Sequence, residues 1–312
     1  MRRFTLKLLR FLLLFLSCIW LVLALIALST NWTLQYEYKY FGHRTHWGSS
    51  LERVNEFEHW ADQKALQPKG LIIGSSTAYR NLNPHLLSDQ TPINWFNYGS
   101  SNQSPNMSYF LLQQAFARTK LDYVLLDIYG PIARHNGLEA AFDLIYNSEL
   151  NWWQKTKLLW RYPNTKLWLR YGYFYTKKIL PCPTYIIHDS TNGTYLKKGF
   201  VCSNQPALQY YNEVQNAKKI PEIPELQQIA KLCHANGARL ILNIAPSLEE
   251  SFLLPTIYRK YPIIHIKQFN NPRHFYDSHH MTCEGANLYS KIVSEKIRPL
   301  TRHVRGRICI QK

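Results

Sequence analysis

Apolar residues in this chain gather into short, mostly apolar runs, separated by longer stretches with apolar positions at helical spacing. Runs of strand length without alternation of apolar and polar residues are typical of strands that are buried on both faces of a sheet. These runs cover residues 70–74, 93–99, 123–129 and 239–246. They predict the core strands of a parallel sheet.

Helical patterns lie between these runs and on either side of them. We expect helices at residues 50–66, 104–120, 223–237 and 283–297. Strands that alternate with helices form a parallel sheet with helices on both faces. The pattern therefore predicts a three-layer α/β domain.

A longer apolar run near the N-terminus has a different meaning. Residues 11–29 contain no charged side chain, and a helix of this length spans about 28 Å, close to the hydrocarbon thickness of a bilayer. The flanking cations are Arg2, Arg3, Lys7 and Arg10, all on the N-terminal side. By the positive-inside rule that end stays in the cytoplasm, and the rest of the chain is extracytoplasmic, either periplasmic or extracellular. We therefore predict a single-pass membrane anchor over residues 1–29; a signal peptide cleaved near residues 27–29 is the alternative.

The rest of the chain divides by composition. We expect a tether and a first helix in residues 30–67, and the α/β domain in residues 68–312 with an insertion at about 134–218. The insertion is rich in Trp, Tyr and Lys, a mixture that suits contact with an anionic membrane surface or polymer. A satellite core of packed aromatic rings is the alternative interpretation.

Charge and cysteine content narrow the classes of partner and cofactor. The formal net charge is +17, but the sequence has no zinc-finger spacing and no nucleic-acid-binding motif, so we expect no nucleic-acid partner. No Cys and His group has metal-ligand spacing, and we predict no metal and no cofactor. Cys182 and Cys202 flank a turn-like segment of an exported chain and predict a disulfide. Cys233, Cys283 and Cys309 are expected to be single thiols.

Side chains with catalytic chemistry follow the predicted strands. They are Ser75 and Ser76 after the first strand, residues 97–102 after the second, and Asp277 with His280 before the last helix. In a parallel sheet, loops at the carboxyl ends of the strands share one edge. A serine becomes a nucleophile when a neutral imidazole accepts its proton and a carboxylate orients that imidazole. The alternative is that the two serines only form a tight turn.

Together these blocks resemble the SGNH (GDSL-type) hydrolase superfamily. Its first block ends a strand in Gly-Asp-Ser or a variant, which Gly-Ser-Ser at 74–76 matches. Its second block, Asn-x-Gly-x-x-Gly, is similar to residues 97–102, and its last block, Asp-x-x-His, matches residues 277–280. The resemblance covers about residues 68–132 and 222–298. It implies a flavodoxin-like sheet.

The resemblance also implies a role for each site residue. Ser76 would be the nucleophile, His280 the general base, and Asp277 the carboxylate that orients the imidazole. Ser75 is then expected inside the turn, hydrogen-bonded to the backbone. His279 is the alternative base, and only the Asp-x-x-His spacing selects His280 over it.

The oxyanion hole implied by the resemblance would consist of the amides of Ser76, Asn102 and Gly99. Asn102 replaces the second-block glycine, and asparagine is the residue besides glycine that best tolerates a left-handed backbone. The third block departs further, because "LLDIYGP" has no asparagine where many members have Gly-x-Asn-Asp. Asp127 has no assigned role there beyond capping or ordering a loop.

The resemblance is to a membrane-anchored branch of envelope esterases and acyl-transfer proteins, such as the D-alanyl transfer proteins of teichoic acid modification. It implies an extracytoplasmic serine esterase or O-acyltransferase that acts on an acylated envelope glycan, polymer or lipid, with an envelope acylation protein as a partner. The alternative function is a non-catalytic accessory protein that kept the fold and binds an envelope polymer or an acylation complex.

Overall fold

The computed structural model describes residues 2–28, 50–64, 67–134, 136–147, 150–162, 164–165, 168, 171–172, 175–176, 193–211, 216–220 and 222–301. The chain divides into two compact units. One consists of Met1–His46 with Leu144–Asp189, and the other of Trp47–Asp143 with Ser190–Lys312. The predicted insertion is thus shared between the two units.

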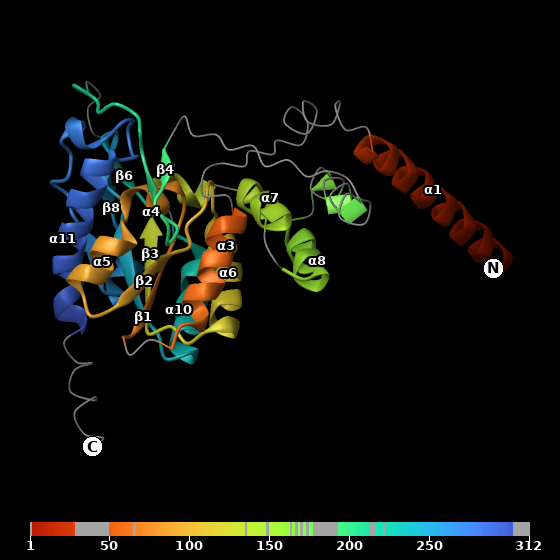
Figure 1. Cartoon of the computed structure of the whole chain (residues 1–312), viewed down its shortest axis with the longest axis horizontal. Helices are drawn as coiled ribbons and strands as arrows, with labels where there is room; N and C mark the ends of the chain where they lie inside the picture. The colour runs from red at the N-terminus through yellow and green to blue at the C-terminus, as the bar shows by residue number, and fades with distance from the viewer. Residues whose placement is uncertain are drawn as a thin grey trace, which may run out of the picture. The chain divides into compact units, whose positions relative to one another are not determined.

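The second unit is built on a five-stranded parallel sheet with the order β2-β1-β3-β7-β9 (Figure 1). Its strands are β1 (Lys69–Ile73), β2 (Asn94–Asn97), β3 (Tyr123–Ile128), β7 (Arg239–Ile244) and β9 (Ile263–His265). Numbered along the chain, these strands follow the order 2-1-3-4-5, which is the flavodoxin-like arrangement. The predicted α/β fold is confirmed, and β9 is an edge strand that the sequence pattern did not predict.

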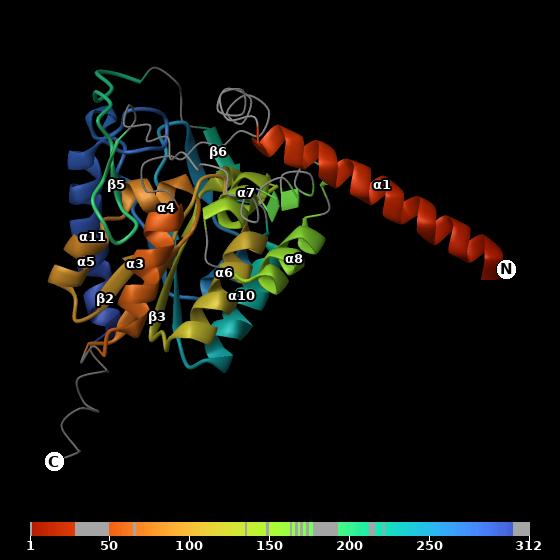
Figure 2. The same cartoon turned by 45° about the vertical axis from the view of Figure 1, so that its right-hand side comes forward.

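Helices cover both faces of this sheet (Figures 1 and 2). One face carries α5 and α11, which pack together, and the opposite face carries α3, α6 and α10 (Figure 1). The helices are α3 (Ser50–Asp62), α5 (Pro84–Gln90), α6 (Pro105–Arg118), α10 (Pro224–Ala235) and α11 (Cys283–Thr301). A short helix, α4 (Ser76–Asn81), follows β1 directly and packs against α11.

Local chemistry fixes the helix boundaries close to the predicted ones. At the start of α6, the Ser104 side chain accepts a hydrogen bond from Met107 N at 3.2 Å, and Pro105 fills the first position, where no amide hydrogen is needed. After α10, Gly237 has a φ of +71°. A left-handed glycine of this kind terminates a helix without steric cost.

The strand register aligns the carboxyl ends of β1, β3 and β7 at one edge of the sheet. Ile73 of β1 lies level with Leu126 of β3, and Asp127 lies level with Asn243 of β7. The side chains of Leu71, Ile72 and Ile73 are completely buried. The apolar run that predicted β1 therefore forms the centre of the core, and its carboxyl end lies beside those of β3 and β7.

Part of the predicted insertion packs on the α/β unit as a hairpin of β4 (Thr194–Tyr195) and β5 (Val201–Cys202). Asn97 N donates to Lys198 O at 2.9 Å, which attaches this hairpin to the edge strand β2. Gly199 has a φ of +79°, and a Cβ there would lie 1.7 Å from Asn97 O, so only glycine fits. A second pair, β6 (Asn216–Lys219) with β8 (Glu250–Leu253), is parallel.

Six more helices complete the described elements. They are the 3-10 helices η1 (Gly130–Arg134), η2 (Thr256–Lys260) and η3 (Pro272–His274), and the helices α7 (Leu138–Asn147), α8 (Trp152–Arg161) and α1 (Arg2–Leu28). Within α1, the stretch Phe4–Leu25 has a mean hydropathy of 2.6 and is long enough to cross a membrane, although a signal sequence has the same properties.

The disulfide prediction was wrong. Cys202 of β5 is bonded to Cys283, the first residue of α11, across a sequence separation of 81. Cys283 is therefore not a single thiol, while Cys182 and Cys309 lie outside the described residues. Proximity along the sequence favoured Cys182, but the hairpin folds back onto the sheet and brings Cys202 to α11. Cys233 is a free, buried thiol, as expected.

We expect this disulfide to stabilise the α/β unit substantially. In the chain-entropy model, closing a loop of this length contributes about 4 to 5 kcal/mol to the free energy of unfolding. Denaturant unfolding of the wild type should shift to lower denaturant in the presence of a reductant, whereas the Cys202→Ser/Cys283→Ser double variant should be less stable and insensitive to reductant. The Cys233→Ala variant is the control and should keep the reductant sensitivity. Mass spectrometry that finds Cys202 free or bonded elsewhere in the unreduced protein would contradict the pairing.

Candidate active site

Three of the predicted site residues lie together at the carboxyl edge of the sheet. Ser76 is the first residue of α4, and Asp277 and His280 lie in the loop that precedes α11. His280 Nε2 lies 2.7 Å from Ser76 Oγ, and His280 Nδ1 lies 2.7 Å from Asp277 Oδ2. The side chains thus form a continuous chain in the order carboxylate, imidazole, hydroxyl.

The hydrogen-bond partners determine the tautomer of His280. An ionised carboxylate can only accept, so the proton lies on Nδ1 and is donated to Asp277. In the neutral ring Nε2 then carries a lone pair, and it accepts the hydrogen bond of the Ser76 hydroxyl. This is the arrangement in which an imidazole can remove the proton of a serine.

The Asp277 carboxylate is held in its ionised form. Its Oδ1 accepts hydrogen bonds from His279 N at 2.9 Å and His280 N at 2.7 Å. Burial alone would raise the pKa of Asp277, but the hydrogen bond and charge interaction with His280, followed by those with His279, hold this pKa well below its usual range. The carboxylate therefore stays charged at neutral pH.

The loop that carries the imidazole is closed by its own backbone. Tyr276 N donates to His280 O at 3.0 Å, and Phe275 and Met281, which form a bridge at its base, are completely buried. The Tyr276 ring stacks on the His280 ring with centroids 5.6 Å apart. The imidazole is thus supported on one face as well as at Nδ1.

The two adjacent serines have different environments. Ser76 is partly exposed, whereas Ser75 is completely buried. The expected bond from Ser75 to the backbone was wrong, because its hydroxyl has no hydrogen-bond partner among the described residues. The preceding Gly74 is required by close packing, since a Cβ there would lie 2.8 Å from the Cβ of Asp127. Of the two hydroxyls, only that of Ser76 contacts the imidazole and is accessible to a reagent.

The expected oxyanion-hole residues are not equally available. The amide of Ser76 precedes the hydrogen-bond ladder of α4, so the helix supplies no partner for it. Asn102 has the left-handed backbone expected of a glycine substitute, with a φ of 48°, and its side chain donates to Glu139. The Gly99 amide donates to Asn97 Oδ1 at 3.1 Å, so it cannot also point at a substrate oxygen. We therefore leave Gly99 out of the hole.

Two buried side chains that the sequence did not single out hold this loop. Asn97 Nδ2 donates to Ala78 O at 2.8 Å and to Leu82 O at 3.0 Å, which ties the loop to α4. Arg53 of α3 donates to Gly99 O at 2.8 Å. Asn97 ends a strand within the second block, and that position was the available signal for it; nothing in the local pattern around Arg53 indicates its role.

Asp127 lies under the nucleophile turn at the centre of a buried polar network. Its carboxylate accepts from Thr77 Oγ1 at 2.5 Å and from Asn243 Nδ2 at 2.6 Å, and Tyr289 donates to Asn243 Oδ1 at 2.9 Å. Burial raises the pKa of Asp127 to about 6, against the opposing effect of the two hydrogen bonds. The network joins α4, β3, β7 and α11, which fits the loop-ordering role.

The neighbouring His279 has other partners. Its Nδ1 lies 2.9 Å from Ser278 Oγ, and its ring stacks on Tyr129 with centroids 4.6 Å apart. A carboxylate oxygen of Asp277 and one ring nitrogen each of His279 and His280 lie within 4.8 Å of one another and could hold a metal ion. Both nitrogens of His280 are already bound to Asp277 and Ser76, so we assign this cluster to serine chemistry.

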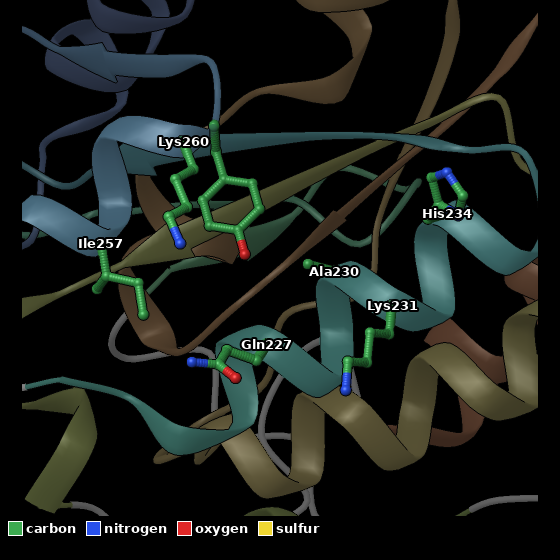
Figure 3. Close-up of a pocket in the computed structure, with 7 residues that line it drawn as sticks. Gln227, Ala230, Lys231, His234, Ile257 and Lys260 are labelled. Atoms are coloured by element: carbon green, nitrogen blue, oxygen red, sulfur yellow. The ribbon is translucent and has the colours of Figure 1, made fainter.

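A surface cleft lies apart from these residues, between α10 and η2 (Figure 3). It has a volume of about 480 Å³ and is lined by Gln227, Ala230, Lys231, His234, Ile257, Lys260 and Tyr261. None of Ser76, Asp277 and His280 lines it. The chemistry therefore cannot take place in this cleft.

Comparisons with known proteins assign no family to the chain. No protein-family model matches the sequence, and no curated protein matches it. Among solved structures, the crystal structure of a "putative acylhydrolase" from Bacteroides fragilis matches with 10% sequence identity and a TM-score of 0.38, covering 81% of this chain and 98% of that chain. A TM-score this low supports no conclusion about activity, so the description of the site rests on its geometry.

The raised pKa of Asp127 predicts a pH-dependent stability. A carboxyl that binds its proton more tightly when folded adds stability as the pH falls through about 6, and this gain is lost as the pH rises. The Asp127→Asn variant carries no charge, so its free energy of unfolding relative to the wild type should increase between pH 4 and pH 8, by up to about 3 kcal/mol.

The measurement is denaturant unfolding of both proteins across this pH range. The Asp62→Asn variant controls for the loss of one negative charge, because Asp62 is exposed in an ion pair with Arg118 and such pairs contribute little to stability. A difference between Asp127→Asn and the wild type that stays constant across the range would show that Asp127 does not titrate in it.

Proposed function

We propose that this protein is a serine esterase or O-acyltransferase of the SGNH type. The observation that carries the proposal is the continuous hydrogen-bonded chain from Asp277 through His280 to Ser76, with 2.7 Å at each step. A serine, a histidine of this tautomer and an ionised carboxylate together form the arrangement that activates a hydroxyl for attack on an acyl carbonyl.

In the proposed reaction, Ser76 Oγ attacks the carbonyl carbon of an ester while His280 Nε2 takes the hydroxyl proton. Asp277 holds the ring and stabilises the imidazolium that results. Collapse of the tetrahedral intermediate breaks the bond to the alcohol, which leaves with the proton from His280. The acyl group is then on Ser76, and water or an acceptor hydroxyl removes it by the same steps, with His280 again acting as base and then as acid.

The oxyanion would be stabilised by the amides of Ser76 and Asn102. The partly exposed position of Ser76 and the left-handed backbone of Asn102 support this assignment. Because the Gly99 amide is occupied and the third block lacks its asparagine, this hole has fewer donors than the family pattern implies. One missing donor lowers kcat by about 100-fold or more, so we expect a slow enzyme on simple esters.

We further propose that the α/β unit lies outside the cytoplasm and acts on an acylated glycan or lipid of the cell envelope. The apolar stretch Phe4–Leu25 and the cations before it support a membrane anchor with this orientation. The Cys202–Cys283 disulfide supports it independently, since structural disulfides persist in oxidising compartments.

The surface of α8 supports an envelope partner. Trp152, Trp153 and Trp160 are 57%, 59% and 71% exposed, and Lys157 lies on the same side of the helix as Trp153 and Trp160. Exposed tryptophans next to cations are typical of surfaces that contact lipid headgroups or anionic polymers. The second candidate function, a non-catalytic accessory protein that binds such a polymer, is favoured by this surface and by the incomplete oxyanion hole.

The two functions differ in their reaction with a serine-directed fluorophosphonate probe. We expect the wild type to be labelled and the Ser76→Ala variant to lose both the label and any esterase activity, with kcat/KM reduced at least about 1,000-fold. The Ser75→Ala variant is the matched control: its buried hydroxyl has no partner, so it should keep most of the labelling. A folded wild type that is never labelled would refute the enzyme and favour the accessory protein.

The proposed topology predicts where a C-terminal reporter is active. A reporter enzyme that works only outside the cytoplasm, fused after Lys312, should be active in the full-length chain. Removal of residues 2–28 should abolish its activity, because the export signal is lost, while the fusion protein is still made. A full-length fusion that is made in normal amounts but shows no reporter activity would overturn the extracytoplasmic assignment.

A further inference from the structure

The nucleophile helix α4 carries a second buried polar residue at its other end. Ser76 is the first residue of this helix and Asn81 the last. The Asn81 side chain is only 1% exposed. A buried carboxamide must satisfy its donor and its acceptor with partners in the protein, so its contacts show what it holds in place.

Asn81 binds the backbone on both sides of the base. Its Nδ2 donates to His279 O at 2.9 Å, and its Oδ1 accepts from Met281 N at 3.0 Å. These two backbone groups flank His280. One rigid side chain therefore fixes the backbone on either side of the imidazole to the helix that begins with the nucleophile.

We propose that Asn81 is a positioning residue that sets the distance between Ser76 Oγ and His280 Nε2. This inference rests on the proposed serine chemistry. In that chemistry the Ser76–His280 hydrogen bond breaks in every cycle, when the proton moves to the imidazole and then to the leaving alcohol. The two bonds of Asn81 involve no reacting atom, so they hold the base in place while that bond is absent.

Besides Asn81, α4 contacts the loop through Arg80, whose guanidinium lies 5.6 Å from the centroid of the Tyr276 ring. Two backbone hydrogen bonds fix the loop to other parts of the unit. Ser278 O accepts from Leu248 N at 2.7 Å, and Phe275 O accepts from Leu208 N at 2.8 Å. These bonds hold the loop to the segment after β7 and to the segment after β5. They do not relate the base to α4, and a small rotation of α4 would leave them intact while the Ser76–His280 distance changed. A misplacement of about 1 Å can cost about 100-fold in rate.

The chain offers a closely matched control in Asn83. Asn83 is also buried, at 8% exposed, and its Nδ2 donates to Asn287 Oδ1 of α11 at 2.8 Å. Its backbone N donates to Ser290 Oγ of the same helix at 2.8 Å. It is the same residue type, two positions away, with a partner about as distant along the sequence. Its bonds go to α11 and, through Oδ1, to His85 N at the start of α5 at 3.0 Å, and none goes to the loop of His280.

The first experiment compares the wild type with Asn81→Ala and Asn83→Ala. Both variants should lose stability to a similar degree in denaturant unfolding. Only Asn81→Ala should react more slowly with the fluorophosphonate, by about 10- to 100-fold in the second-order rate constant, while Asn83→Ala should stay within about twofold of the wild type. With an ester substrate, the loss in Asn81→Ala should fall on kcat and leave KM nearly unchanged. Equal rates for the two variants would overturn the inference.

A spectroscopic measurement tests the inference independently of activity. The proton between His280 Nδ1 and Asp277 Oδ2 should give a resolved downfield NMR signal, and the Ser76→Ala variant should retain it. The signal should broaden or exchange faster with solvent in Asn81→Ala and remain sharp in Asn83→Ala. If Asn81→Ala does not fold, Asn81→Leu replaces it, since it keeps a side chain of similar size and loses both hydrogen bonds.

The two measurements separate the inference from the proposed function. The wild type could remain unlabelled while its His280 proton signal is sharp and depends on Asn81. That result would refute the proposed enzymatic function but would still show that Asn81 holds the imidazole in place. A labelled wild type whose signal and labelling rate are the same in both asparagine variants would keep the enzyme and refute the role of Asn81.

Discussion

The hydrogen bond between Ser76 Oγ and His280 Nε2 is the interaction on which the interpretation of this structure depends. It joins side chains 204 residues apart at a distance of 2.7 Å. Hydrogen bonds weaken steeply with distance and angle, so both backbones must be fixed to within a fraction of an ångström. The parallel sheet fixes the backbone of Ser76, which follows β1, a strand with neighbours on both sides. The backbone of His280 lies in a loop outside the sheet and must be fixed by other contacts.

Fixing this loop requires polar groups in the core, and those groups are costly unless each finds a partner. The carboxyl edge of the sheet meets this requirement in two places. Asp127 is bonded to Asn243 and to Thr77 of α4, and Asn81 at the end of α4 is bonded to the loop of His280. Asp127 is the extreme case, since burial raises its pKa to about 6 and a charged carboxylate is tolerated only because two donors satisfy it. The unit thus gives up some stability near neutral pH for a defined position of the nucleophile turn.

The sequence predicted the parts of this arrangement that depend on local patterns. Mostly apolar runs without alternation located four of the five strands of the central sheet, because strands buried on both faces have no polar face. The edge strand β9 has only three residues, too few to form a recognisable run. The spacing of Asp277 and His280 placed them in one loop, and the resemblance paired them with Ser76. Local pattern and motif together were therefore sufficient for the fold and for the three central residues.

The remaining features depend on contacts between distant segments, which a local pattern does not contain. Cys202 pairs with Cys283 because a hairpin folds back on the sheet, although Cys182 is much closer along the chain. Asn81 at the end of a short helix is indistinguishable from an ordinary capping residue until the loop of His280 is seen beside it. At Gly99 the local motif is present, because the residue matches the second block, but the structure shows that its amide donates to Asn97 Oδ1.

A site with few oxyanion donors depends more heavily on positioning. Donors and orientation each contribute several kcal/mol to lowering a reaction barrier, so a chain that lacks one donor keeps a useful rate only if its base and nucleophile are well aligned. Asn81 supplies alignment without adding charge to the site. A membrane anchor, as we propose, would relax the demand further, because a substrate confined to the same surface would be present at a high effective concentration. The proposed slow, well-aligned serine site therefore suits an acylated component of that membrane surface better than a freely diffusing ester.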